Sequence, residues 1–145
     1  ILGAGGAAKA VHRAHADNGD TVTIMARRLK SFETFTTTDF RPLLNTKFDG
    51  ERFDAVINAT PLGLKGEDVF EKMNINPEFI SNETIGMDLI YNPASTPFMT
   101  YFKRSENGLG MLVNQALDAF KIWTGQEGNK KAVEDALLEK MEEKK

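Results

Sequence analysis

Short runs of apolar and β-branched residues alternate along this chain with longer stretches in which apolar residues recur at helical spacing. The short runs predict strands at 21–26, 53–59 and 84–91. The helical spacing predicts helices at 7–18, 109–124 and 131–142. Ile1 and Leu2 precede a glycine-rich turn and are interpreted as the end of one more strand, so we expect this chain to be part of a longer protein. Strands that alternate with helices predict an α/β protein with a mainly parallel sheet.

Other segments have weaker patterns. Residues 30–44 combine features of a short helix, a strand near Thr36 and a second short helix, whereas residues 68–80 mix helix and loop. Thr96 and Pro97 predict the start of a helix, because proline is tolerated in a first helical turn. Two apolar sets are predicted to pack in the interior or along one helix face. They are the pair Phe120 and Trp123, and the stripe Val133, Ala136, Leu137 and Met141.

The pattern Gly3-x-Gly5-x-x-Ala8 lies between a strand and a helix, which is the setting of a dinucleotide-binding fingerprint. Gly3 permits the tight turn, and Gly5 lets the backbone approach a pyrophosphate, with which a Cβ would clash. Ala8 is small enough for close packing of the helix on a strand. The N–H groups of Gly5, Gly6 and Ala7 would lie at a helix N-terminus, which attracts anions. This predicts a Rossmann-like, doubly wound sheet flanked by helices, with a glycine-rich turn that binds nothing as the alternative.

The residues after the second strand indicate which dinucleotide is bound. In NAD-binding versions of this fold an acidic residue ends that strand and binds the ribose 2′-hydroxyl. Here Arg27 and Arg28 follow the strand, and Lys30 lies close behind them. A guanidinium group pairs with a 2′-phosphate, which a carboxylate would repel. The pattern favours NADP as the cofactor, and plain surface charge is the alternative interpretation of the two arginines.

The composition is that of an ordinary globular domain. The 145 residues carry a net charge of −3 and include no cysteine. The charge argues against a nucleic-acid or polybasic membrane surface, and the lack of cysteine excludes disulfides and cysteine nucleophiles. No apolar run reaches the roughly 20 residues that span a bilayer. His12 and His15 are the only histidines and are interpreted as surface or packing residues, so no metal site is expected. We expect a cytoplasmic protein.

Four sequence blocks occur in an order that is typical of one family. They are Gly3–Ala8, Ile57–Gly63, Asp88–Pro93 with Thr96 and Pro97, and Gly108–Gln115 with Ala119 and Phe120. Together they resemble the C-terminal, NADP-binding domain of shikimate dehydrogenase, over almost the whole chain. The resemblance implies one NADP-binding Rossmann domain at residues 1–145. It also implies that the last helix, 131–142, packs on a substrate-binding N-terminal domain that this chain lacks.

The resemblance assigns cofactor contacts beyond the glycine turn and the basic residues after the second strand. Asn58, Ala59 and Thr60 would line the cofactor at the end of their strand, where ligands lie in open α/β sheets. Gly110 and Met111 would contact the nicotinamide. From the residue pattern alone, Met111 is equally a core residue of an amphipathic helix.

Tyr91 and Gln115 would reach the substrate, although the pattern alone also allows a packed aromatic and an ordinary helix-flank glutamine. The family's catalytic pair is a lysine and an aspartate of the N-terminal domain, so no catalytic residue is assigned here. The activity implied is reversible reduction of 3-dehydroshikimate to shikimate by NADPH, in the chorismate pathway of aromatic amino-acid biosynthesis. The partners implied are that small-molecule substrate, no nucleic acid and no membrane, with a monomer or homodimer for the full-length protein.

The chain departs from the family pattern in four places, and two other functions stay open. Ala26 stands where the family usually has asparagine, and Arg28 stands where it usually has threonine or serine. Only residues 103–107 occupy the place of a further short strand, and the stretch between Arg28 and Phe53 is also short. One alternative is a stand-alone NADP-binding module without catalysis. The other is a related dehydrogenase that acts on quinate or another substrate, because the fold alone does not fix the substrate.

Overall fold

The computed structural model describes residues 1–26, 35, 39–42, 48 and 50–142. The chain divides into two compact units, Ile1–Asn107 and Gly108–Lys145, which are described separately. The first unit carries the sheet, and the second consists of two helices.

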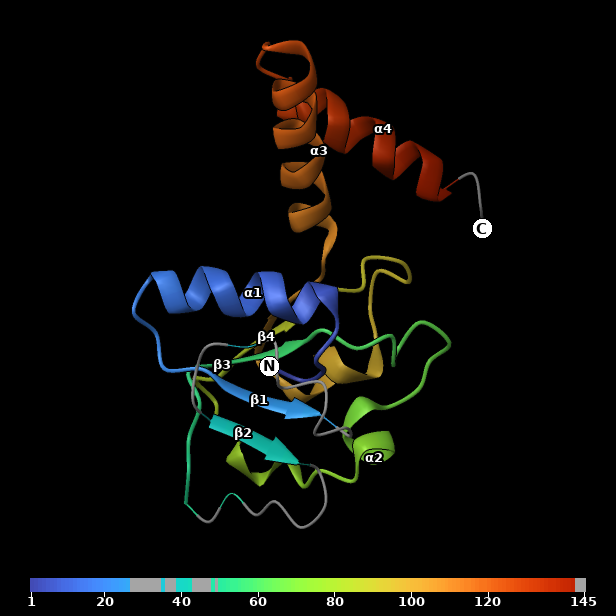
Figure 1. Cartoon of the computed structure of the whole chain (residues 1–145). Helices are drawn as coiled ribbons and strands as arrows, with labels where there is room; N and C mark the ends of the chain where they lie inside the picture. The colour runs from blue at the N-terminus through green and yellow to red at the C-terminus, as the bar shows by residue number, and fades with distance from the viewer. Residues whose placement is uncertain (27–34, 36–38, 43–47, 49, 143–145) are drawn as a thin grey trace. The chain divides into compact units, whose positions relative to one another are not determined.

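The first unit has α/β architecture (Figure 1). Its helices are α1 (Gly6–Asp17), α2 (Val69–Met73) and two 3₁₀ helices, η2 (Pro77–Phe79) and η3 (Pro97–Tyr101). Its strands are β1 (Thr23–Ala26), β2 (Asp39–Pro42), β3 (Ala55–Asn58), β4 (Ile85–Asp88) and β5 (Arg104–Glu106).

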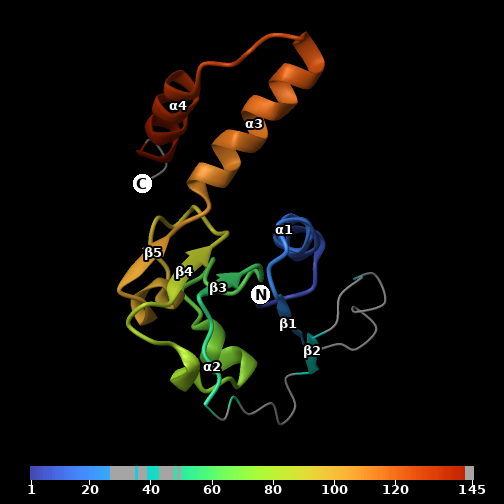
Figure 2. The ribbon, with the colours of Figure 1, turned by 90° about the vertical axis from the view of Figure 1, so that its left-hand side faces the viewer.

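Parallel pairing joins β2 to β1 and places β4 between β3 and β5. Leu2 connects these two groups, because it forms parallel bridges with Met25 of β1 and with Asn58 of β3. The N–H of Leu2 donates to the carbonyl of Ile57 at 2.8 Å, and the N–H of Ala59 donates to the carbonyl of Leu2 at 2.9 Å. The resulting order, β2–β1–Leu2–β3–β4–β5, can be followed from edge to edge in Figure 2. It is the strand order of the doubly wound dinucleotide-binding fold, so the predicted fold class is confirmed.

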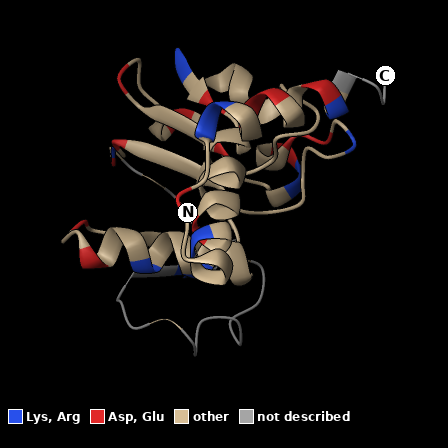
Figure 3. Cartoon of the chain, turned by 90° about the horizontal axis from the view of Figure 1, so that it is seen from above, with Lys and Arg blue, Asp and Glu red and all other residues tan. Residues whose placement is uncertain are grey.

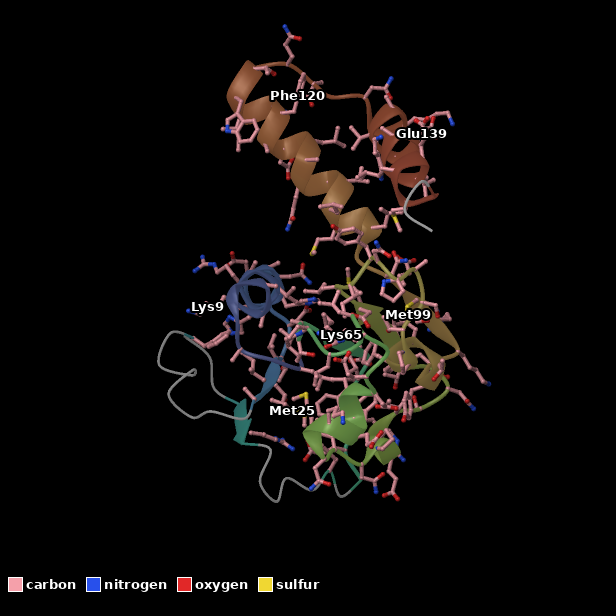
Figure 4. All side chains as sticks on the ribbon, turned by 90° about the vertical axis from the view of Figure 1, so that its right-hand side faces the viewer. Lys9, Met25, Lys65, Met99, Phe120 and Glu139 are labelled. Atoms are coloured by element: carbon pink, nitrogen blue, oxygen red, sulfur yellow. The ribbon has the colours of Figure 1, made fainter. Side chains whose placement is uncertain are left out.

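Both faces of the sheet are covered, with α1 above and α2 below it in Figure 1. Side chains of β1 alternate between the two faces, as the period of a strand requires. Ile24 and Ala26 belong to one apolar cluster, against which Phe35 packs. The ring centroids of Phe35 and of His12 on α1 lie 5.2 Å apart. Met25, labelled in Figure 4, belongs to the cluster on the other face. That cluster contains Leu2, Met25, Val56, Val69, Phe70, Met73, Ile75, Phe79, Phe98 and Phe102.

His12 is buried, and the side chain of His15 is 40% exposed, in agreement with their interpretation as packing or surface residues. The Nδ1 atom of His15 lies 2.7 Å from a carboxylate oxygen of Asp20. This hydrogen bond, followed by one from Asn18, holds the pKa of the Asp20 carboxyl below its usual value. The contact closes the turn between α1 and β1, at the edge of the sheet remote from the glycine-rich turn.

Three sequence predictions about the elements need correction. The segment 103–107 contains the short strand that it was thought too short to form, because β5 pairs with β4 from Arg104 to Glu106. A strand lies at Asp39–Pro42, where the second short helix of residues 30–44 was expected, and the strand expected near Thr36 lies outside the described residues. The terminal proline of β2 is compatible with an edge strand, which has one partner only. The helix that begins after Thr96 is a 3₁₀ helix and not an α-helix.

The second unit contains α3 (Leu109–Thr124) and α4 (Lys130–Glu142), which contact one another. Within the predicted stripe of α4, Val133, Leu137 and Met141 are half-buried, whereas Ala136 is exposed. The prediction that Phe120 and Trp123 lie in the core is wrong. Trp123 is 83% exposed, and Phe120, labelled in Figure 4, is 42% exposed.

Acidic and basic residues are interspersed over the described elements, rather than gathered by sign on one element (Figure 3). A search of the described residues finds no helix with the length and apolarity required to cross a membrane.

A carboxylate at the start of α2 links this helix to η3. One oxygen of Asp68 caps α2 by accepting from the N–H groups of Phe70 and Glu71. The other oxygen accepts from the hydroxyl of Tyr101 at 2.6 Å. Because the hydrogen bond to this carboxylate favours the protonated phenol, the pKa of Tyr101 is raised above its ordinary value.

We expect the Asp68→Asn variant to lower the pKa of Tyr101 toward the ordinary phenol value of about 10. A spectrophotometric titration of the phenolate measures this shift, with the parent chain as the reference. Because the folded-state pKa is raised, the contact contributes its full stability below the unfolded-state pKa and loses it as the pH rises through the folded-state value. Identical tyrosine titrations in the parent chain and the variant would contradict the contact.

Candidate dinucleotide site

The glycine-rich turn lies at the point where the strand order reverses. Gly3 has φ +104°, a conformation that L-residues rarely adopt, and its N–H donates to the carbonyl of Met25 at 2.8 Å. A Cβ added at Gly3 would lie 3.0 Å from the carbonyl oxygen of Ala59 and 3.1 Å from Cγ2 of Thr60. The turn therefore touches the segment that leaves β3. This is the crevice at the carboxyl ends of the strands in which open α/β sheets bind ligands.

The first turn of α1 is shaped to receive an anion. Gly5 caps the helix without a side-chain hydrogen bond, and no acidic residue lies in the first turn. A Cβ added at Gly5 or Gly6 would have no atom of the described residues within 4 Å, so packing against this part of the chain does not require either glycine. The first N–H groups of a helix have no partner within the helix, and the macrodipole favours negative charge there. The open space beside Gly5 and Gly6, together with the N–H donors at the start of α1, fits a pyrophosphate group.

Ala8 is fully buried, in agreement with the prediction that a small residue is needed for close helix–strand packing. Gly6 and Ala7 begin α1, and both are exposed, as is the capping residue Gly5. The predicted pyrophosphate residues Gly3, Gly5, Gly6 and Ala7 thus form one turn, in which Gly3 lies beside Ala59 and Thr60. Their contact with a dinucleotide stays a prediction.

Asn58, at the end of β3, is fully buried and makes four hydrogen bonds inside the protein. Its amide group donates to the carbonyl of Leu62 at 3.0 Å and to Asp88 at 3.1 Å. Its oxygen accepts from the N–H of Thr60 at 3.0 Å and from the Thr60 hydroxyl at 2.7 Å. These bonds use the whole capacity of an asparagine side chain. Asn58 therefore shapes the turn, and Ala59 and Thr60 are the residues that this turn presents at the crevice.

The loop after Thr60 is closed by another carboxylate. Glu67 accepts from the N–H groups of Gly63 at 3.2 Å and Lys65 at 2.9 Å. Backbone hydrogen bonds, from Glu67 itself, Lys65 and Gly63, hold the pKa of the Glu67 carboxyl below its usual value. Gly63, at φ +117°, packs closely on the loop after β4, because a Cβ there would lie 3.2 Å from Ile90 and 3.4 Å from Thr96.

Tyr91 lies in the loop after β4 and is 37% exposed, directly before a cis peptide bond between Asn92 and Pro93. This exposure fits a packed aromatic with a solvent-exposed hydroxyl as well as a substrate contact, so the role of Tyr91 stays a prediction. The loop ends at Thr96, which is buried. Tyr91 thus lies at the carboxyl edge of the sheet, in the loop that follows β4, the strand next to β3.

The remaining predicted site residues fall outside this arrangement. Arg27, Arg28 and Lys30 lie outside the described residues, directly after β1. Gly110, Met111 and Gln115 belong to the second unit, in the first two turns of α3. There Gly110 and Gln115 are exposed and Met111 is half-buried. Their roles stay predictions.

The sequence predicts no role in the site for Asp88 and Thr96, whose side chains the structure places between the loops after β3 and β4. Both side chains are buried, and the Thr96 hydroxyl donates to Asp88 at 2.6 Å. The signal in the sequence is an aspartate at the end of an apolar strand, a position where an unpaired carboxylate would be costly.

A separate groove of about 550 Å³ lies at the opposite edge of the sheet, beside the amino ends of the strands. Its lining includes Thr23 of β1, Ala55 of β3, and the contact pair His15 and Asp20. Ligands of open α/β sheets bind at the carboxyl ends, so we do not assign this groove to the dinucleotide. Among the described residues, no cluster of three or more His, Asp or Glu side chains is placed to hold a metal ion.

Comparison with known proteins agrees with this geometry. A family profile, the shikimate 5′-dehydrogenase C-terminal domain, matches residues 108–138. A shikimate dehydrogenase (NADP(+)) of Methanocaldococcus jannaschii is 35% identical over 97% of this chain and 54% of its own length.

Solved structures give the same result. A crystal structure of a shikimate dehydrogenase in complex with NADP+ matches with a TM-score of 0.74 at 33% identity, over 97% of this chain and 53% of that one. A ligand-free 5-ketofructose reductase of Gluconobacter sp. strain CHM43 matches with a TM-score of 0.73 at 30% identity, over 96% of this chain and 55% of that one. The chain spans about half the length of the relatives it matches. With its strand order and glycine turn, this chain belongs to the shikimate dehydrogenase family and is homologous to the NADP-binding half of those enzymes.

Proposed function

We propose that this chain binds NADP(H) for a shikimate dehydrogenase, which reduces 3-dehydroshikimate reversibly to shikimate. The observation that carries the proposal is the position of the glycine turn against Ala59 and Thr60 at the reversal of strand order. A capping glycine with open space above it and no acid in the first turn of α1 supports a pyrophosphate there. The NADP+ complex of a related shikimate dehydrogenase supports the choice of cofactor.

When bound, the nicotinamide supplies or accepts the hydride. The residues of this chain bind and orient it: the N–H groups at the start of α1 hold the pyrophosphate, and Arg27, with Arg28 or Lys30, pairs with the 2′-phosphate. Ala59 and Thr60 border the nicotinamide half, with Gly110 and Met111 as further contacts from α3. Tyr91 and Gln115 contact the substrate. The domain comprises residues 1–145, and the α4 stripe packs on the substrate-binding domain.

A second candidate is the reduction of another polyhydroxylated ketone at the same site. The similarity to a 5-ketofructose reductase at 30% identity favours it, because that protein shares this half while its name gives another substrate. Parallel assays of the protein that contains this chain, with dehydroshikimate and with 5-ketofructose, separate the two candidates. Faster turnover of dehydroshikimate supports the first candidate.

The cofactor preference gives a direct test of the proposal. We expect the chain to bind NADPH more tightly than NADH, because Arg27 pairs with the 2′-phosphate. The Arg27→Ala variant should lose about tenfold in NADPH affinity, the effect of one charge-assisted contact, and should bind NADH unchanged. Titration of the nicotinamide fluorescence measures both affinities.

Arg13→Ala is the matched control, because Arg13 is exposed on α1 and pairs with the nearby Asp17. This variant should bind both cofactors as the parent chain does. Tighter binding of NADH than NADPH by the parent chain would overturn the role of Arg27. Absence of binding to either cofactor would overturn the proposed function itself.

A further inference from the structure

The carboxylate of Asp88, at the end of β4, is fully buried and joins three segments of the chain. One oxygen accepts from the amide of Asn58 at 3.1 Å and from the N–H of Ile90 at 3.0 Å. The other oxygen accepts from the hydroxyl of Thr96 at 2.6 Å. The partners come from the end of β3, from the start of the loop that carries Tyr91, and from the residue that begins η3.

Each of these bonds fixes a loop rather than a strand. Through Asn58, Asp88 holds the turn that carries Ala59 and Thr60, because Asn58 also bonds the N–H and hydroxyl of Thr60. Through Ile90 and Thr96, it holds both ends of the segment around Tyr91. The two loops also touch, since Gly63 packs against Ile90 and Thr96.

The chemistry of Thr96 indicates that this carboxylate determines the loop geometry. Thr96 caps η3, where a threonine hydroxyl ordinarily accepts from a helix N–H, but it makes no such bond and donates to Asp88 instead. Burial of a carboxylate is costly, and hydrogen bonds to the charged form offset that cost. A leucine in place of Asp88 would be buried without the cost of desolvating a carboxylate, but it would hold neither loop by hydrogen bonds.

These two loops lie on one side of the point where the strand order reverses. In doubly wound folds the residue after the second strand contacts the adenosine ribose, so the adenosine half lies over β1 and β2. The nicotinamide half then lies over β3 and β4, at whose carboxyl ends the two loops are found. The substrate must meet the nicotinamide at the same place.

We propose that Asp88 is a positioning residue for the nicotinamide half of the site, which sets the Thr60 turn and the Tyr91 loop in a common arrangement through Asn58, Ile90 and Thr96. This inference rests on the proposed function. It differs from a purely structural role, because it concerns one half of the dinucleotide and leaves the adenosine half untouched.

The test compares two ligands that differ only in the nicotinamide part. Calorimetry measures the affinities of the chain for NADPH and for 2′-phospho-ADP-ribose, which lacks the nicotinamide. The variant Thr96→Val keeps the shape of the side chain and removes the hydroxyl that bonds Asp88. We expect about tenfold weaker binding of NADPH, the effect of one lost charge-assisted hydrogen bond, and unchanged binding of 2′-phospho-ADP-ribose.

Two matched variants isolate the hydroxyl. Thr96→Ser keeps the hydroxyl and removes the methyl group that packs on Gly63, so it should bind both ligands as the parent chain does. Thr100→Val removes an exposed threonine hydroxyl of the same 3₁₀ helix, which donates to the carbonyl of Pro97 at 2.7 Å, and should have no effect. If circular dichroism shows that Thr96→Val does not fold, Asp88→Asn replaces it, with the same selective loss expected.

The outcomes separate the inference from the function on which it rests. Equal losses for both ligands, or an unchanged NADPH affinity in Thr96→Val, would overturn the positioning role while the cofactor site stands. A larger loss in Thr96→Ser than in Thr96→Val would also overturn it, because packing and not the hydroxyl would then set the loops. If the parent chain binds neither ligand, the proposed function fails first.

Discussion

The Gly5→Ala variant should bind NADPH about a hundredfold more weakly than the parent chain, while its folding is almost unchanged. The backbone at Gly5, with φ −82° and ψ −170°, is accessible to any residue, and a Cβ there meets no atom within 4 Å in the part of the chain that the structure describes. The added methyl group therefore fits the folded chain. It occupies the space above the first turn of α1, and so it keeps the pyrophosphate from the several N–H donors that would hold it. Fluorescence titration with NADPH and a thermal melt measure the two quantities.

Ala7→Gly provides the opposite combination. It removes a methyl group from the first turn of α1 and retains the N–H, so NADPH binding should persist. Stability should fall by up to about 1 kcal/mol, because glycine is a poor helix former. If Gly5→Ala binds NADPH as tightly as the parent chain, the pyrophosphate does not lie above this helix, and the proposed site is misplaced.

The sequence was sufficient for the fold because its signals are local. The β-branched runs of β1 and β3, the glycine turn, and the apolar periodicity of α1 and α3 each lie within one element. Each predicted boundary of these elements therefore falls within a few residues of the observed one. The short strand β5 was missed because three residues, two of them charged and exposed, carry no strand pattern of their own, and β4 supplies the pairing.

The site was predictable only where backbone alone defines it. A glycine in a turn pattern directly predicts a backbone conformation that favours glycine, and Gly3 has such a conformation, with φ +104°. The hydrogen-bond network was hidden, because Asn58 and Asp88 stand 30 residues apart and only the pairing of β3 with β4 brings them together. Asn58 was recognised as a site residue, but its position in the sequence gave no sign that all its bonds are internal.

The exposed apolar side chains of α3 show a second limit of the same kind. Periodicity marks an apolar face, but it does not say which element covers that face. Ile122 and Trp123 are 80% and 83% exposed within the described residues, so their apolarity has another cause than the core of this chain. Large exposed apolar side chains of this kind mark contact surfaces. In the proposed function, a substrate-binding domain packs on this pair of helices and would supply such a contact.

The Gly3→Ala variant should lose about 3 kcal/mol of unfolding free energy, from two sources that add. An alanine at φ +104° is strained by about 1–2 kcal/mol. Its Cβ would also lie 3.0 Å from the carbonyl oxygen of Ala59, which is backbone and cannot rotate away. Relief of this contact separates Leu2 from β3, so cofactor binding should be lost as well. Urea unfolding measures the first effect, and NADPH titration measures the second.

Gly66→Ala separates the two sources of strain. Gly66 has φ +79°, and a Cβ there meets no atom within 4 Å, so alanine at this position is strained by its backbone alone. Its loss should be about 1 kcal/mol, and it should leave NADPH binding intact. The difference between the two variants is the energy of the contact between the glycine turn and β3. Equal losses would mean that this contact contributes nothing, and that Gly3 is required for the turn but not for the crevice in which the dinucleotide is proposed to bind.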